Sequence, residues 1–566
     1  MKKFILVFAY GMLFQTGFAQ GLPKWADKAK KAVFSVITYT KDNKILNTGN
    51  GFYIDPNGTA VSDYSLFKGA DHAVVVTADG KELPVKYIMG ANDMYDVVKF
   101  RTEADKKLSA LQPATQAAKV GETVYLLPYA TQKSDNGQSG TIARLDTIAT
   151  NSFYYTIDMS TTPKTVSCPI MNANGEVIGL IQKNADETSK ESYAIGINYA
   201  RSLAISALSI NDMSLNSIGI KKGLPEDESQ AQVYLIMASN QLDENSYFNL
   251  LNDFIATYPN NMEGYLRRAT YYMNKGEDAD NALADADLKK MKSVADKKED
   301  ACFNIGKLIY SYQLHKGDQK TYGDWTYERA LNEINEAISL SDQPIFHQTL
   351  GDIYFAMQKY QEAYEAYMKV NKSNLVSAAT YYSAAKAKEL TEGSDKKEVI
   401  ALMDSAVACY AQPYGTETAP YLYERARVKM DAKDYREAVK DYNAFYDAMK
   451  GQVNGEFYVA RMQAELQGRM YKQALDDVNK AVELEPNNSG YWAEKGGAHM
   501  RVNQLKEATA ALEKAIALDA KNAPAYRMLG YTQIQQKKEQ EGLGNLKKAK
   551  ELGDEIAEGL IQKYSK

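Results

Sequence analysis

A period of 34 residues in the C-terminal part of the chain constrains its fold more than any other feature. Aromatic residues recur with this step at Tyr458, Trp492 and Tyr526. Two sets of small residues keep the same step, one at Ala474, Ala508 and Gly542 and the other at Ala481, Ala515 and Ala549. A fixed period of this length predicts stacked pairs of helices, because a single pair cannot bury its apolar face without neighbours.

The pattern inside each period resembles the tetratricopeptide repeat, with an aromatic residue on a first helix and small residues where the second helix must approach closely. Looser units are recognisable over residues 264–286, 349–367 and 423–438. We expect about eight or nine repeats over residues 229–556 and a C-terminal cap over residues 557–566. The resemblance implies an all-α solenoid whose concave wall binds a peptide or a protein partner.

Residues 31–208 show another pattern, in which short apolar runs alternate with turns. Residues 32–39 are rich in β-branched and aromatic side chains, and residues 73–77 and 83–88 flank a turn and predict a hairpin. Further runs follow up to residue 182, and a helix is expected near residues 199–208. Many short strands at regular spacing predict an all-β sandwich or a pair of barrels.

This N-terminal region resembles the protease domain of the HtrA/Deg family, which has the trypsin fold. The resemblance rests on segments that keep the family's order and spacing, beginning with Gly-Asn-Gly-Phe at residues 49–52 and continuing at 61–70, 93–100, 119–124, 172–179 and 193–198. It implies two six-stranded β-barrels with a cleft between them. The expected fold is therefore multidomain, an all-β trypsin-like double β-barrel followed by an all-α tetratricopeptide-repeat solenoid.

The resemblance also implies where a Ser-His-Asp triad would lie. Ser65 stands at the family's histidine position, Asp96 at the aspartate and Val166 at the serine, and Lys164 replaces the glycine two residues before it. A serine hydroxyl attacks poorly without an adjacent general base, and members of a triad act as a unit. His72 is the one histidine between residues 20 and 208 and lies seven positions past the expected place. We therefore expect a catalytically inactive protease fold with a degenerate triad.

Ser167 and Cys168 remain as candidates for a displaced nucleophile, although the sequence shows no base for either. For Cys168 the alternative is a small buried apolar residue. For Asp96 the alternative is a carboxylate held by main-chain N–H groups at the start of a strand.

The N-terminus predicts export. A basic start, an apolar run and the small residues before a cut after Ala19 are the parts of a signal peptide over residues 1–19. No later stretch has the roughly 20 apolar residues that span a bilayer. Three scattered cysteines do not suggest a disulfide framework, which favours a bacterial periplasm.

Composition excludes several classes of function. A net charge of −5 gives no general attraction to nucleic acid. The sequence carries no phosphate loop, dinucleotide motif or metal-ligand cluster, so we expect no cofactor and no metal.

The expected domains are a pseudoprotease over residues 20–208, a polar linker over 209–228 and the repeats that follow. Together they predict an exported scaffold or adaptor that binds proteins or peptides through the solenoid and the barrel cleft. One alternative is an active serine endopeptidase with a displaced nucleophile that uses the repeats to recruit substrates. Another is a component of an envelope or secretion assembly, in which both domains only dock.

Overall fold

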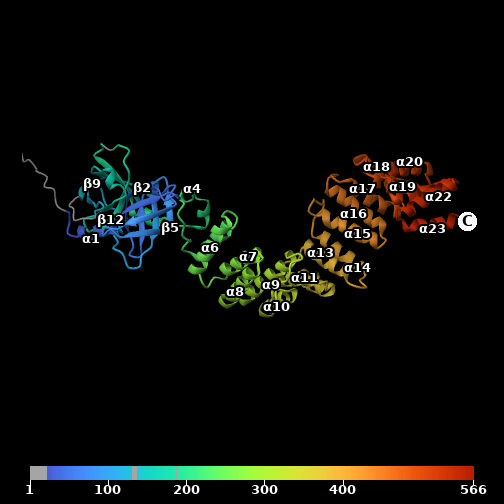
Figure 1. The fold of residues 1–566 in the computed structure, drawn as a ribbon, viewed down its shortest axis with the longest axis horizontal. Helices are drawn as coiled ribbons and strands as arrows, with labels where there is room; N and C mark the ends of the chain where they lie inside the picture. The colour runs from blue at the N-terminus through green and yellow to red at the C-terminus, as the bar shows by residue number, and fades with distance from the viewer. Residues whose placement is uncertain (1–21, 131–136, 187, 566) are drawn as a thin grey trace, which may run out of the picture. The chain divides into compact units, whose positions relative to one another are not determined.

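A computed structural model describes residues 22–130, 137–186 and 188–565. These residues form two compact units, with the division between residues 271 and 272. The first unit contains the strands, and the second is built from helices (Figure 1). The predicted signal peptide over residues 1–19 lies outside the described residues.

The first barrel is closed and has the strand order β1-β2-β3-β6-β5-β4. All of its pairings are antiparallel, and β1 closes the ring by pairing with both β2 and β4. Along β1 and β5, buried residues alternate with more exposed ones, so that one face of each strand fills the barrel interior. Its strands are β1 (Val33–Tyr39), β2 (Ile45–Tyr53), β3 (Thr59–Ser62), β4 (His72–Val76), β5 (Glu82–Asn92) and β6 (Val97–Thr102).

The second barrel is closed by the pairing of β11 with β12, which completes a ring of six strands in the order β11-β8-β9-β10-β13-β12. A short seventh strand, β7, pairs in parallel with β12. The predicted double barrel is thereby confirmed. The strands are β7 (Gln112–Pro113), β8 (Thr123–Leu126), β9 (Gln138–Ala149), β10 (Ser152–Asp158), β11 (Pro169–Met171), β12 (Glu176–Ile181) and β13 (Glu191–Gly196).

Short helices flank the barrels, and the polar stretch predicted as a linker over residues 209–228 contains buried apolar side chains. Ile210, Leu215, Ile218 and Ile220 are buried in one core with the first barrel and with helices α5 and α6. Four apolar residues spread through a polar stretch are therefore enough to fasten this connection to the barrel. The elements are α1 (Ala26–Ala29), α2 (Tyr64–Phe67), α3 (Ile197–Ser202), α4 (Met213–Asn216), α5 (Glu228–Ala238), α6 (Glu244–Thr257) and the 3-10 turns η1 (Lys30–Ala32), η2 (Pro163–Thr165) and η3 (Ala207–Asn211).

Successive antiparallel helices make up the second unit, and α7 (Met262–Lys275) spans the boundary between the units. Within the described residues of the second unit, the helices from α9 to α22 form seven consecutive pairs in contact, and α23 follows them. Those after α7 are α8 (Asp278–Val294), α9 (Lys298–His315), α10 (Tyr327–Leu340), α11 (Pro344–Ala356), α12 (Tyr360–Asn371), α13 (Ala378–Leu390), α14 (Lys396–Ala408), α15 (Ala419–Asp431), α16 (Tyr435–Ala448), α17 (Gly455–Gln467), α18 (Tyr471–Leu484), α19 (Ser489–Arg501), α20 (Leu505–Leu518), α21 (Ala523–Gln535), α22 (Glu539–Glu551) and α23 (Glu555–Tyr564).

The small residues of the 34-residue period lie where paired helices touch. Ala474 and Ala508 are fully buried. At the next step, a Cβ added to Gly542 would lie 2.6 Å from the carbonyl oxygen of Gly530 on the partner helix. The small residues of the period therefore lie at contacts between helices, as the repeat pattern predicts.

Among the described helices, none has both the length and the apolar character needed to cross a membrane.

Candidate functional site

A cleft of about 400 Å³ lies at the position that the trypsin fold reserves for its active site. The first barrel contributes residues 47–49 of β2 together with Asp63 and Ser65. The second barrel contributes residues 161–163, 166 and 167, which follow β10, and Lys183 and Asn184, which follow β12. Both barrels thus wall the cleft, and its volume suits a small ligand or a few residues of a peptide.

Ser65 lines this cleft and contacts Asp96, the residue that the resemblance matches to the aspartate of the triad. Asp96 Oδ1 accepts the main-chain N–H of Ser65 at 2.6 Å, and Oδ2 accepts the Ser65 hydroxyl at 3.0 Å. In a working triad the aspartate orients a histidine that takes the proton from the nucleophile. Here the aspartate is present but orients a hydroxyl, which cannot act as a base near neutral pH.

The main chain at the nucleophile position is held by Asn50. Its Nδ2 donates to the carbonyl oxygens of Lys164 at 3.0 Å and Val166 at 2.8 Å. Asn50 stands where the family's Gly-Ser-Gly-Phe segment has a serine, and its longer amide reaches both carbonyls. The segment is further fixed by η2, in which Thr165 N–H donates to Thr162 O at 2.9 Å. These bonds hold the main chain around Val166, the residue that the resemblance matches to the family's serine.

Ser167 is almost fully buried, with 1% of its surface exposed, and has the left-handed backbone angle φ of +64°. Its N–H donates to Ile181 O at 2.9 Å, so this N–H is not available to an oxyanion. Cys168 is fully buried, and burial raises the pKa of its thiol to about 12. Since the thiolate is the nucleophilic form, Cys168 is unreactive near neutral pH.

Asp63 is a cleft residue that the sequence interpretation missed. It is 2% exposed, and burial, aided by the negative charge of Asp96, raises the pKa of its carboxyl well above the usual range. Contact with the Ser167 hydroxyl opposes this shift, although neither Asp63 Oδ1 nor Ser167 Oγ has a well-aligned hydrogen-bond partner. Asp63 lies two positions before Ser65, inside a segment that resembles the family, and this closeness to a triad position is the signal that points to it.

His72 does not replace the missing base. It begins β4, its ring stacks on Tyr39 with centroids 4.9 Å apart, and Nδ1 lies 3.1 Å from Asp71 Oδ2. It is not among the residues that line the cleft.

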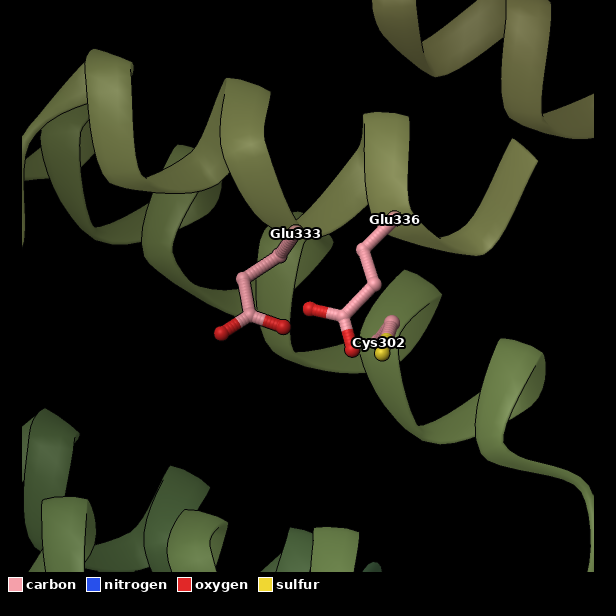
Figure 2. A group of neighbouring side chains, drawn as sticks. All are labelled: Cys302, Glu333 and Glu336. Atoms are coloured by element: carbon pink, nitrogen blue, oxygen red, sulfur yellow. The ribbon is translucent and has the colours of Figure 1, made fainter. Parts of the chain in front are cut away.

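In the second unit, Cys302 of α9 faces Glu333 and Glu336 of α10 (Figure 2), and their potential ligand atoms lie within 4.8 Å of one another. Lys292 already occupies this site, because its Nζ donates to Glu333 at 2.9 Å and to Glu336 at 2.7 Å. Burial also raises the pKa of the Cys302 thiol to about 11, which disfavours the thiolate that metals bind. The cluster is an ion-pair network that joins three helices.

The two regions of the chain match two different protein families. The family described as "Trypsin-like peptidase domain" matches residues 49–180, and "Tetratricopeptide repeat" matches residues 346–375 and 489–522. The chain is 24% identical over 178 residues to the "Probable periplasmic serine endoprotease DegP-like" of Halomonas elongata, covering 31% of this chain and 36% of that protein.

Two further relatives extend the comparison. The "Putative serine protease HhoB" of Synechocystis is 24% identical over 186 residues, covering 32% of this chain and 44% of its own. The "TPR repeat-containing protein MJ1428" of Methanocaldococcus jannaschii is 23% identical over 349 residues, covering 54% of this chain and 57% of its own. The chain thus spans between about one third and just over half the length of each of these three relatives. It combines a trypsin-like peptidase domain of the HtrA/DegP type with a tetratricopeptide-repeat region, a combination suited to protein interactions.

Proposed function

We propose that this protein is an exported, periplasmic scaffold whose peptidase domain is catalytically inactive and whose cleft and repeats bind peptides or proteins. The observation that carries the proposal is the Ser65–Asp96 pair, in which the aspartate that should orient a histidine holds a serine. The relatives named as periplasmic or serine proteases support the compartment and the ancestry. Docking in an envelope assembly is a variant of the same proposal with a different partner.

The cleft keeps the features that bind a peptide before any chemistry occurs. It is open, and its lining mixes hydroxyl and amide groups with the exposed cation Lys183. Extended peptides bind such grooves through main-chain hydrogen bonds, with selectivity from side-chain contacts. In the second unit, the lining of a hollow of about 440 Å³ includes the aromatic residues Tyr423, Phe445 and Phe457. Aromatic side chains of this kind anchor protein contacts.

Peptide binding to the cleft is tested by filling it. Thr48 is exposed on the cleft wall, so Thr48→Trp adds bulk there without disturbing the core. Thr147 is an exposed threonine of β9 outside the cleft, which makes Thr147→Trp the matched control. Fluorescence polarisation of dye-labelled, unfolded casein should show weaker binding to Thr48→Trp and unchanged binding to the control. Equal binding by both variants would remove the cleft from the proposal.

The role of the repeats is tested by crosslinking in the native host, followed by recovery of the full chain or of a chain that ends at Lys275. The shortened chain keeps α5, α6 and α7, since α5 and α6 share the core of the first barrel. Loss of the crosslinked partners from the shortened chain supports docking on the repeats. Their retention assigns them to the barrels or to α5–α7 instead.

The second candidate function is a serine endopeptidase with Ser167 as the nucleophile and Asp63 as its base, favoured by the contact between these two side chains. A base must accept a proton, and a carboxyl with a strongly raised pKa is already protonated near neutral pH. The candidate predicts hydrolysis of casein that Asp63→Asn abolishes and that increases as the pH rises. The scaffold proposal predicts no hydrolysis by either protein.

A further inference from the structure

A second cavity, of about 500 Å³, lies in the first unit and shares no lining residue with the cleft. Its walls come from β5, β6, residues 221–226 and the last turn of α6. Main-chain bonds fix one wall, because Ile88 N–H donates to Lys221 O and Gly223 N–H donates to Ile88 O, both at 2.8 Å. The cavity is thus built into the barrel, at a size typical of small-molecule sites.

Positive charge dominates this cavity. The charged residues that line it are four cations and two carboxylates, namely Lys86, Arg101, Lys221, Lys222, Glu226 and Asp253. Asp253 is already engaged in an ion pair, because its Oδ2 lies 2.5 Å from Lys221 Nζ. Lys221 also lies near the C-terminal end of α6, where the helix dipole adds negative charge. Glu226 is left to balance three cations, and the buried Lys99 beside the cavity also draws on its charge.

Two of these cations lack the partner that their burial calls for. Lys222 is half-buried, donates to the carbonyl oxygen of Ile218, and pairs with no carboxylate among the described residues. Burial lowers its pKa to about 8, with no opposing acid. Arg101 Nη1 donates to Asn57 O at 2.8 Å, but its buried Nε has no hydrogen-bond partner. A buried cation without a counter-charge is costly, and a bound anion would relieve that cost.

We propose that this cavity binds a small organic anion, whose carboxylate or phosphate group pairs with Arg101 and Lys222. The guanidinium of Arg101 and the ammonium of Lys222 are cationic donors of the kind that pair with carboxylate and phosphate groups. The apolar side chains of Tyr87, Met89 and Leu224 line the same cavity and accommodate the organic part of the ligand. The site is independent of the protease-like cleft and of its proposed function.

Isothermal titration of the full chain with benzoate, phenyl phosphate and inorganic phosphate tests the proposal, with benzamide as the neutral counterpart of benzoate. At least one organic anion should bind with a Kd of about 1 mM or below in low salt, and benzamide should not bind. The phosphate probe separates recognition of the anionic group from recognition of the organic part. Stronger binding of benzoate than of phenyl phosphate would show that the site prefers a carboxylate, and the reverse would show that it prefers a phosphate.

Variants identify the site. Lys222→Met and Arg101→Gln should each weaken binding about tenfold or more, because each removes a charge-assisted hydrogen bond. Lys222→Arg should retain binding, and Lys119→Met, an exposed lysine outside the cavity, should leave it unchanged. Circular dichroism and thermal unfolding check that each variant is folded. The proposal is overturned when neither organic anion binds the wild-type chain, or when both charge-removing variants bind as the wild type does.

Discussion

Glu465 provides a quantitative test of how the repeats are held together. Each of two successive repeats contains a buried ion pair between an arginine of its first helix and an aspartate of its second helix. Arg425 contacts Asp441 through Nε and Nη2 at 3.0 and 2.6 Å, and Arg461 contacts Asp477 in the same way at 2.7 and 2.8 Å. Both members of the second pair lie 36 positions after those of the first.

The neighbour of these pairs differs between the two repeats. Lys429 contacts Asp441 at 2.7 Å in the first, and 36 positions later Glu465 lies buried beside Asp477. Burial, with the charge of Asp477 adding to it, raises the pKa of Glu465 from 4.5 to about 8. Glu465 is therefore protonated in the folded protein at pH 7.

The raised pKa makes the stability of these helices depend on pH. A group with a higher pKa in the folded state contributes stability that is complete below its unfolded pKa and lost as the pH rises through its folded pKa. At 1.36 kcal/mol per pH unit, the free energy of unfolding that Glu465 contributes falls by about 3 kcal/mol between pH 4.5 and pH 7. Glu465→Gln keeps the size and the hydrogen-bonding capacity of the side chain and removes the titration.

Hydrogen exchange of α17 and α18 in the full chain, measured at pH 5 and pH 8, gives the effect locally. The protection of Glu465→Gln relative to wild type should increase about 400-fold between the two pH values. Glu483→Gln, on the exposed face of α18, should show no such increase. An equal ratio at both pH values for Glu465→Gln would refute the reasoning, since it would mean that Glu465 is ionised or hydrated in the folded protein.

Three further predictions follow from individual contacts. Asn50→Ala should lower the stability of the barrels by about 1–3 kcal/mol in chemical denaturation, since it leaves two carbonyls near the cleft without their donor; an unchanged midpoint would contradict the role of this amide. Iodoacetamide at pH 8 should modify the exposed Cys409 and leave the buried Cys168 untouched in mass spectra of peptides, and rapid labelling of both would contradict the raised thiol pKa. Lys292→Met should lower stability by about 1–2 kcal/mol, because two glutamates lose their counter-charge, and added zinc should not restore it; recovery with zinc would show a metal site instead.

Much of the fold follows from periodicity. The 34-residue step and the short apolar runs predict the repeats and the double barrel because both patterns arise from burial of regularly spaced side chains. No apolar run predicts strand β9, because most of its residues are exposed and no alternation marks it. The packing of residues 209–228 was missed for a related reason, since its buried residues are single apolar positions in a polar sequence.

The candidate sites depend on contacts between distant residues, which periodicity does not report. Asn50 reaches residues 164 and 166, and Asp63 meets Ser167, in each case across more than one hundred positions. The family resemblance brings the triad positions together but says nothing of the new residues that surround them. The cavity at Arg101 and Lys222 has no sequence signature, because its cations come from two strands and a segment more than one hundred residues later.

The central claim, that the trypsin-like domain binds without cutting, is tested most directly with a serine-directed fluorophosphonate on the purified full chain. Digestion of casein is followed in parallel, and trypsin serves as the positive control. The account predicts no labelling and no digestion, with Ser167→Ala behaving as the wild type does. Labelling at Ser167 that disappears in Ser167→Ala, together with casein cleavage, would contradict it.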